Sequence, residues 1–438
     1  MDKLIDRYRE FLDRGKTERE CVKEIVRQAE AAGYKDISSV SALRPGDKVY
    51  YIQYGKSAAL FNVGTEPIEN GMNILGAHID SPRLDVKMNP LYEDSSLVYL
   101  DTHYYGGIKK YQWVTMPLAI HGVAVKKDGT SVELSLGEDD DLAFCISDIL
   151  PHMAHEQMRK TASEFIPGEQ LDVIVGLAEK TDDKDKEKGK KAVLQILKDG
   201  YGIEEQDFIS AELEVVPAGK AKLMGFDRSM VLAYGQDDRV CAFASLDAML
   251  STAETARTAC CLLVDKEEIG SVGSTGMNSV FFENAAAELL SRLEGGYDGL
   301  KLRRMMRNCL MLSSDVNSAF DPLNPALFDK KNSSYLAGGV VFNKYTGSRG
   351  KSGASDANAE FIAKVRAKMD EKQIKYQMAE MGKVDLGGGG TIAKFAAYYG
   401  MQVIDCGVAV LSMHAPWEIT SVKDIISADS CYKAFLTL

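Results

Sequence analysis

The stretch Cys260–Ser271, CCLLVDKEEIGS, decides the fold of this chain. An apolar run that passes directly into charged residues and a glycine predicts a buried parallel strand whose carboxyl end opens into a polar loop. Open α/β sheets place their chemistry at that end. The adjacent carboxylates of Glu267 and Glu268 are costly to bury together unless a cation compensates them or one holds a proton. On an extended backbone they point to opposite sides, so one is expected to bind a metal while the other handles protons. A solvated acidic loop is the alternative interpretation.

Composition narrows the class of protein. The chain has 438 residues, enough for a large core and about two domains. Its net charge of -12 and pI near 5.2 argue against nucleic-acid or membrane-surface partners. The first 33 residues are too charged for a signal peptide, and no apolar run is long enough to span a bilayer. We therefore expect a cytoplasmic protein. Its eight cysteines lack CxxC spacing, which favours reduced core thiols.

The N-terminal part alternates helix and strand signals before it reaches a histidine. Residues 3–33 predict two helices, the second with a capping box formed by Thr17 and Glu20. Two strands of a hairpin follow at 49–54 and 58–63. The next strand ends in His78-x-Asp80, where the carboxylate is placed to hold the imidazole in one tautomer, the usual support for a metal-bound histidine. A histidine that is only hydrogen-bonded is the alternative.

The pattern of apolar and polar residues changes between residues 90 and 228. Alternating segments predict a β-rich insertion, with strands at 97–100, 117–125, 132–136, 171–175 and 213–216. The catalytic domain is therefore expected to be discontinuous, over 1–89 and 229–438. The aliphatic segment around His121, MPLAIHGVAV, suits subunit association, although a plain domain core explains it nearly as well.

Polar residues follow several apolar strands in the C-terminal half. Asp237 and Asp238 precede a predicted helix at 240–255, and Asp238 has an ordinary role as a cap of that helix. Asp315 follows the apolar run at 309–312, and His414 follows a predicted strand at 401–411. Four glycines at 387–390 open a helix and let a ligand approach main-chain amides, but they match no nucleotide-binding motif.

Together these positions form a metal-binding set. Two histidines and three carboxylates suit two zinc-like ions that share one bridging carboxylate. Two such ions polarise a carbonyl and lower the pKa of bound water to about 7. Glu267 is then free to take a proton from water and pass it to the leaving amine. The residues are His78, Asp237, Glu268, Asp315 and His414.

Six ordered motifs resemble one family. The chain is similar over nearly its whole length to the aspartyl aminopeptidase and vacuolar aminopeptidase I family of zinc exopeptidases. The motifs are GAHIDSPR (76–83), YGQDDRV (234–240), DKEEIGS (265–271), SSDVNSA (313–319), GGVVFNKY (338–345) and SMHAPWE (412–418).

The resemblance implies a fold and a set of roles. The fold is α/β, a zinc-exopeptidase-like central and mostly parallel sheet flanked by helices, with the β-rich insertion as a dimerisation domain. Asp237 would bridge the ions, His78 and Asp315 would complete one shell, and Glu268 and His414 the other. Glu267 would be the general base and Asp80 the partner of His78. The implied residues at the substrate are His121 (reaching a neighbouring subunit's site), Lys344, Gly388, Gly389 and Thr391.

The expected function is a metal-dependent aminopeptidase acting on short peptides. By the resemblance, dimers assemble into a dodecamer that encloses the active sites. Zinc is the expected metal, with cobalt or manganese as alternatives. Where aspartyl aminopeptidases carry a His-containing motif this chain has DVNSA (315–319), so the preferred N-terminal residue stays open. Alternatives are a carboxypeptidase or amide deacylase of the same superfamily, and a non-catalytic metal-binding shell protein.

Overall fold

The computed structural model describes residues 3–138, 141–178 and 187–438. The chain divides into two units, and each is described by itself. Unit 1 comprises Met1–Asp80, Ala221–Met413 and Glu418–Leu438, and unit 2 comprises Ser81–Lys220 with His414–Trp417. The insertion expected at 90–228 overlaps most of unit 2.

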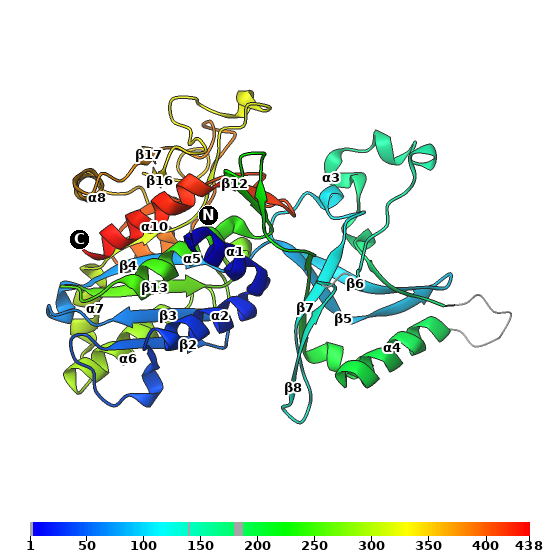
Figure 1. Ribbon diagram of the computed structural model, residues 1–438, viewed down its shortest axis with the longest axis horizontal. Coiled ribbons are helices and arrows are strands. Elements are labelled where there is room, and N and C mark those ends of the chain that lie inside the picture. The colour runs from blue at the N-terminus through cyan, green and yellow to red at the C-terminus, as the bar shows by residue number, and fades with distance from the viewer. Residues whose placement is uncertain (1–2, 139–140, 179–186) are drawn as a thin grey trace. The chain divides into compact units, whose positions relative to one another are not determined.

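A nine-stranded mixed sheet forms the centre of unit 1 (Figure 1). At its middle, β13, β4, β14 and β18 run parallel, whereas β2, β3 and β16 introduce antiparallel pairings. The α/β prediction is confirmed. In spatial order the strands are β1 (Lys35–Asp36), β2 (Lys48–Gln53), β3 (Ser57–Asn62), β13 (Thr258–Val264), β4 (Met72–His78), β14 (Leu310–Ser313), β18 (Gln402–Gly407), β16 (Val340–Asn343) and β17 (Tyr376–Met378).

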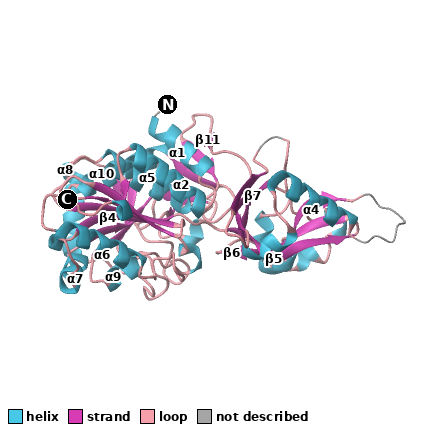
Figure 2. Ribbon diagram, turned by 90° about the horizontal axis from the view of Figure 1, so that it is seen from below, coloured by secondary structure: helices cyan, strands magenta, loops and turns pink. Residues whose placement is uncertain are grey.

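The central strands are buried on both faces because their side chains alternate between two cores. Along β13, Cys261 and Leu263 pack into one core, whereas Cys260 and Leu262 pack into the other. Figure 2 shows α5 and α10 on one side of β4 and α6 and α9 on the other. The first core contains α1 (Lys3–Arg14), α2 (Glu18–Ala31), α5 (Gln236–Ser251), α8 (Ala359–Glu371) and α10 (Val422–Leu436); the second contains α6 (Phe281–Glu294), α7 (Gly299–Arg307) and α9 (Ala393–Tyr398).

The N-terminal helices follow the predicted signals. Thr17 accepts a hydrogen bond from the main-chain N–H of Glu20, and the Glu20 carboxylate accepts one from the N–H of Thr17. This capping box starts α2 at Glu18, because it satisfies main-chain N–H groups that have no partner inside the helix. The predicted pair of helices is confirmed.

Unit 1 contains a second sheet of five strands. The prediction of one strand over 401–411 is wrong, because that apolar run divides at Val408 into β18 and β19, which belong to different sheets. The strands in spatial order are β11 (Lys222–Met224), β12 (Met230–Ala233), β20 (Glu418–Ser421), β19 (Ala409–Leu411) and β15 (Asn317–Ser318).

Unit 2 is built on a six-stranded antiparallel sheet. Its strands in spatial order are β8 (Ser131–Leu136), β7 (Leu118–Val125), β10 (Ala211–Pro217), β5 (Arg83–Asp94), β6 (Leu97–Tyr105) and β9 (Val173–Leu177). In the described part of this unit, two α-helices accompany the sheet, α3 (Ala162–Phe165) and α4 (Lys188–Tyr201). Within residues 3–138, 141–178 and 187–438, no helix is long and apolar enough to cross a bilayer.

Candidate metal centre

The carboxyl ends of neighbouring parallel strands meet at one edge of the nine-stranded sheet. β4 ends at His78, which lies opposite Val264 at the end of β13. On the other side of β4, Ser313 at the end of β14 lies opposite Gly76. The segments that follow these strands carry Glu267, Glu268 and Asp315, so the register of the sheet brings them to the same edge as His78.

Three overlapping groups of side chains collect there. Within each group, one nitrogen or oxygen atom from each side chain lies within 4.8 Å of those of the other members. The His78 Nε2 is 3.2 Å from Asp237 Oδ1. One imidazole with several carboxylates is a donor set that zinc accepts. The groups are His78, Asp237 and Glu268; His78, Glu267 and Asp315; and Asp237, Asp238 and Asp315.

Asp80 contacts the other nitrogen of the His78 ring. His78 Nδ1 lies 3.3 Å from Asp80 Oδ1 and 3.0 Å from the main-chain oxygen of Asp80. Burial by itself lowers the pKa of His78, but hydrogen bonds with Asp237 and Asp80 offset this, and the net pKa is raised well above its ordinary value. With Nδ1 held, Nε2 is the ring nitrogen directed at Asp237.

Glu267 and Glu268 lie next to each other in one short turn. The expectation of an extended backbone is wrong, because Glu267–Ile269 is a 3₁₀ turn that begins after Lys266 with φ of 69°. The Asp80 carboxylate accepts hydrogen bonds from the main-chain N–H of Glu267, at 3.1 Å, and of Glu268, at 3.2 Å. The two glutamates still take part in different groups, since Glu268 accompanies Asp237 and Glu267 accompanies Asp315.

Asp238 is a member of the centre that the sequence interpretation assigned only to helix capping. It is fully buried, and its Oδ2 accepts a hydrogen bond of 3.4 Å from the N–H of His78. Burial is the main cause that raises the pKa of Asp238, and it also raises the pKa of half-buried Asp315, with Asp238 adding to the effect. Carboxylates that are difficult to ionise together fit a site built to hold cations.

The structure places two other predicted residues in unit 2. His414 Nδ1 lies 2.9 Å from the main-chain oxygen of Gly107. The His121 ring is buried in β7, with Nε2 3.1 Å from Glu138 Oε1. The metal role of His414 and the substrate role of His121 stay predictions.

The other predicted substrate residues lie in unit 1, in segments outside its strands and helices. Lys344 is exposed just after β16, and Thr391 donates a hydrogen bond of 2.6 Å to Asp405. The main-chain N–H of Gly389 donates to Thr346, and Gly388 has φ of 102°. A pocket of about 390 Å³ adjoins these loops, lined on one side by Tyr345–Gly347 and Arg349–Lys351 and on the other by Glu380–Val384 and Gly387.

A family model for the "aminopeptidase I zinc metalloprotease (M18)" family matches residues 11–436. The chain belongs to this family. It is a metal-dependent aminopeptidase, a hydrolase of peptide bonds, as expected from the six motifs. The predicted zinc-exopeptidase family is confirmed.

The sequences and structures of relatives match nearly the full length of this M18 chain. A protein of Clostridium acetobutylicum, named a probable M18 family aminopeptidase 1, is 57% identical over 438 residues, which cover 99% of this chain and 94% of that protein. The crystal structure of an M18 aminopeptidase from Thermotoga maritima has a TM-score of 0.95 at 43% identity, over 99% of this chain and 96% of that one. The yeast mApe1 dodecamer shares the fold, with a TM-score of 0.79 at 22% identity over 99% and 96%.

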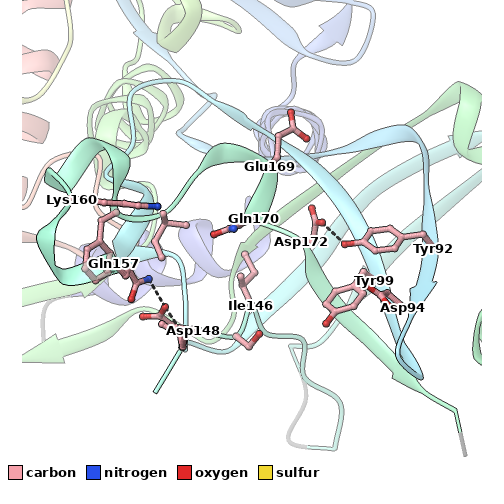
Figure 3. Close-up of a pocket in the computed structure, with 14 residues that line it drawn as sticks. Tyr92, Asp94, Tyr99, Ile146, Asp148, Gln157, Lys160, Glu169, Gln170 and Asp172 are labelled. Atoms are coloured by element: carbon pink, nitrogen blue, oxygen red, sulfur yellow. Dashed lines mark hydrogen bonds between the residues drawn. The ribbon is translucent and has the colours of Figure 1, made fainter. Parts of the chain in front are cut away.

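Another pocket lies within unit 2 of this aminopeptidase and contains none of the predicted site residues (Figure 3). Its volume is about 720 Å³. On one wall Tyr92 donates a hydrogen bond of 2.5 Å to Asp172, and its ring stacks on Tyr99 with centroids 5.1 Å apart. On another wall Gln157 donates to Asp148 at 3.0 Å. Asp148 and Asp172 hydrogen-bond to uncharged neighbours, and Glu169 accepts a hydrogen bond of 2.7 Å from Lys87. The residues that line this pocket include no histidine, so it differs in chemistry from the centre of unit 1.

Proposed function

We propose that this aminopeptidase works with two divalent cations, zinc in the first place, and that Asp237 bridges them. The overlap of the three donor groups on His78, Asp237 and Asp315 supports this proposal, because groups that share members hold neighbouring ions. His78 and Asp315 complete one shell. Glu268 and His414 complete the other, and His414 joins this set through the resemblance of SMHAPWE.

The ions would supply polarisation of the scissile carbonyl and acidification of water. Glu267 acts as the general base that takes the proton from the attacking water and returns it to the leaving amine. Its main-chain N–H is fixed by Asp80, so the carboxylate starts from a defined position. Asp80 also holds Nδ1 of His78 and thereby directs Nε2 toward the centre.

The substrates we propose are short peptides with a free N-terminus. Lys344 and the loop Gly388–Thr391 bind them in this proposal, because their chain neighbours Tyr345 and Gly387 line the pocket of unit 1. His121 is proposed to complete the site of a neighbouring subunit. The β-rich insertion serves as a dimerisation domain, and dimers assemble into a dodecamer, the state named for yeast mApe1. We also propose that the protein is cytoplasmic.

The first experiment measures hydrolysis by metal-stripped protein before and after addition of zinc, cobalt or manganese. Aminoacyl amides of Asp, Glu, Leu, Met and Lys serve as substrates. We expect metal-dependent release of the N-terminal residue, and the ranking of the five amides shows whether Lys344 imposes an acidic preference. Peptides blocked at either end separate an aminopeptidase from a carboxypeptidase. Absence of hydrolysis by protein that is folded and metal-loaded would contradict the proposed chemistry.

A matched pair of variants tests whether Glu267 transfers protons while Glu268 binds metal. Glu267→Ala should reduce kcat by at least about a hundredfold while bound metal stays near the wild-type level, because a general base contributes about 10² to 10⁴ in rate. Glu268→Ala should lose metal as well as activity. Metal content measured by atomic absorption beside kcat distinguishes the two, and near-normal turnover of Glu267→Ala would remove its assigned role.

A further inference from the structure

Gln236 occupies a buried position immediately before Asp237. Its side chain is completely enclosed and makes four hydrogen bonds. The Nε2 group donates to the main-chain oxygens of Glu418, at 2.6 Å, and Val231, at 3.2 Å. Oε1 accepts from the hydroxyl groups of Thr420, at 2.5 Å, and Tyr8, at 3.0 Å. We call these side chains, with that of Glu418, the Gln236 network.

The orientation of this amide is determined by its partners. Two main-chain carbonyl oxygens only accept, so they must face the NH₂ group of Gln236. The two hydroxyl groups then face Oε1. Both donors and both acceptor positions of the side chain are occupied, which fixes it in one place. A glutamate at 236 would instead direct an acceptor oxygen at carbonyl oxygens.

Glu418 holds the other side of the same main chain. It lies in β20 opposite Ala233 of β12 and is 1% exposed. Its Oε2 accepts a hydrogen bond of 2.9 Å from the main-chain N–H of Asp237. The peptide that carries Asp237 is therefore held through the Gln236 side chain on one side and through the Glu418 carboxylate on the other.

This segment needs such support because it leaves the regular helix. Asp237 has φ of -79° and ψ of 108°, outside the helical region, and Gly235 before it has φ of 68°. A helix alone therefore does not define the direction of the Asp237 carboxylate. Tyr8, a residue of α1 228 positions earlier in the chain, links the Gln236 network to that helix.

We infer that Gln236 and Glu418 are positioning residues for Asp237, and that Tyr8 extends this function to helix α1. The inference rests on the proposed function, in which Asp237 bridges two cations. Neither residue belongs to the three donor groups; each acts through the main chain next to or at Asp237. Loss of this support moves the carboxylate away from both ions together, so the affinity for metal falls before the fold is lost.

The test measures zinc dissociation constants of the full-length protein by competition with a chelator. Gln236→Glu should weaken zinc binding by about 10- to 100-fold, which is the usual loss when a residue that orients a metal ligand is replaced. Glu418→Ala should do the same. Glu418→Gln keeps an acceptor oxygen for the N–H of Asp237 and should stay within a few-fold of wild type. Equal losses in the two Glu418 variants would overturn the positioning role and indicate a purely electrostatic one.

Milder variants cover the case in which Gln236→Glu does not fold. Thr420→Val and Tyr8→Phe each remove one donor to Gln236 and retain the shape of the side chain. Tyr50→Phe is the matched control, since the Tyr50 hydroxyl donates to Glu30 at 2.9 Å and takes no part in the Gln236 network. We expect weaker zinc binding in the first two variants and wild-type binding in the control. Unchanged zinc binding in both would overturn the inference.

Two further measurements distinguish failure of the positioning role from failure of the bridging role of Asp237. The free energy of unfolding of the metal-free protein reports a structural role, so a variant that loses this stability with unchanged zinc affinity contradicts positioning. Asp237→Ala tests the proposed function itself. If Asp237→Ala binds zinc as the wild type does, the bridging role fails. If it loses zinc whereas Gln236→Glu and Glu418→Ala do not, only the positioning role fails.

Discussion

At the scale of single residues, Asp80 shows what spacing along the chain predicts and what it leaves out. The HxD spacing predicted a contact between Asp80 and His78, and the two side chains are in contact. The same carboxylate also holds two main-chain amides 187 and 188 positions away. Such a contact depends on which strands are neighbours. Asp238, Gln236 and Glu418 were missed for the same reason, although each lies inside a motif that marked the site.

Asp405 gives a prediction about pH. Burial raises the pKa of Asp405 to about 6, while Thr391 donates a hydrogen bond to its carboxylate. Because the pKa in the folded state exceeds that of the unfolded chain, its contribution to stability is present below about pH 4 and is lost as the pH rises through about 6. Asp405→Asn removes the charge and keeps an acceptor oxygen. The difference in free energy of unfolding, Asp405→Asn minus wild type, should be more positive at pH 8 than at pH 4, by up to about 3 kcal/mol.

Urea unfolding of metal-free protein at the two pH values provides the measurement. Asp199→Asn, at an exposed position of α4, is the control for the same chemical change in a solvated setting. A difference between Asp405→Asn and wild type that is the same at pH 4 and pH 8 would show that the buried carboxyl is not the source of the pH dependence.

At the scale of elements, apolar runs predicted most strands but not their partners. The run 401–411 is continuous in sequence, yet β18 pairs with β14 and β16 whereas β19 pairs with β15 and β20. Periodicity contains no information about which sheet an apolar strand joins. The glycines at 387–390 were predicted to expose amides to a ligand. The N–H groups of Gly387 and Gly389 instead bond within the protein, so the glycines allow loops to pack closely.

Gly388 and Gly390 form a matched pair for testing this packing. A Cβ at Gly388 would lie 2.6 Å from Ser348 Cα, at a φ of 102° that side chains rarely adopt, whereas a Cβ at Gly390 meets no atom within 4 Å. Gly388→Ala should displace the loop beside the pocket and raise KM by about tenfold or more. Gly390→Ala should leave KM unchanged. Steady-state kinetics on one aminoacyl amide suffices, and equal KM values in both variants would exclude a role of the loop in substrate binding.

At the scale of the whole molecule, the metal centre couples ligand binding to stability. Buried carboxylates that resist ionisation together destabilise the metal-free fold, and cations that bind only the folded chain reverse this effect. Zinc at 100 times its dissociation constant should raise the free energy of unfolding by about 2.7 kcal/mol per site. Denaturant unfolding with and without zinc measures this increase.

Asp315→Ala should lose a large part of that stabilisation, because Asp315 belongs to two of the three donor groups. Asp199→Ala, in α4 of unit 2, should keep all of it. A zinc effect of the same size in Asp315→Ala and in wild type would show that zinc stabilises the protein from a different place.

The position of β4 in the sheet determines when this strand can pair during synthesis of the chain. Its two neighbours in the sheet are β13 and β14, and both follow the main segment of unit 2, Ser81–Lys220, in the chain. On the ribosome, β4 therefore emerges with its apolar faces long before residues 258–264 and 310–313 exist. Unit 2 is nearly complete by Lys220 and can fold in that interval. β4, which follows β1, β2 and β3 in the chain, must wait for the chain to return before it pairs with its neighbours. Over that period its apolar faces are exposed to aggregation.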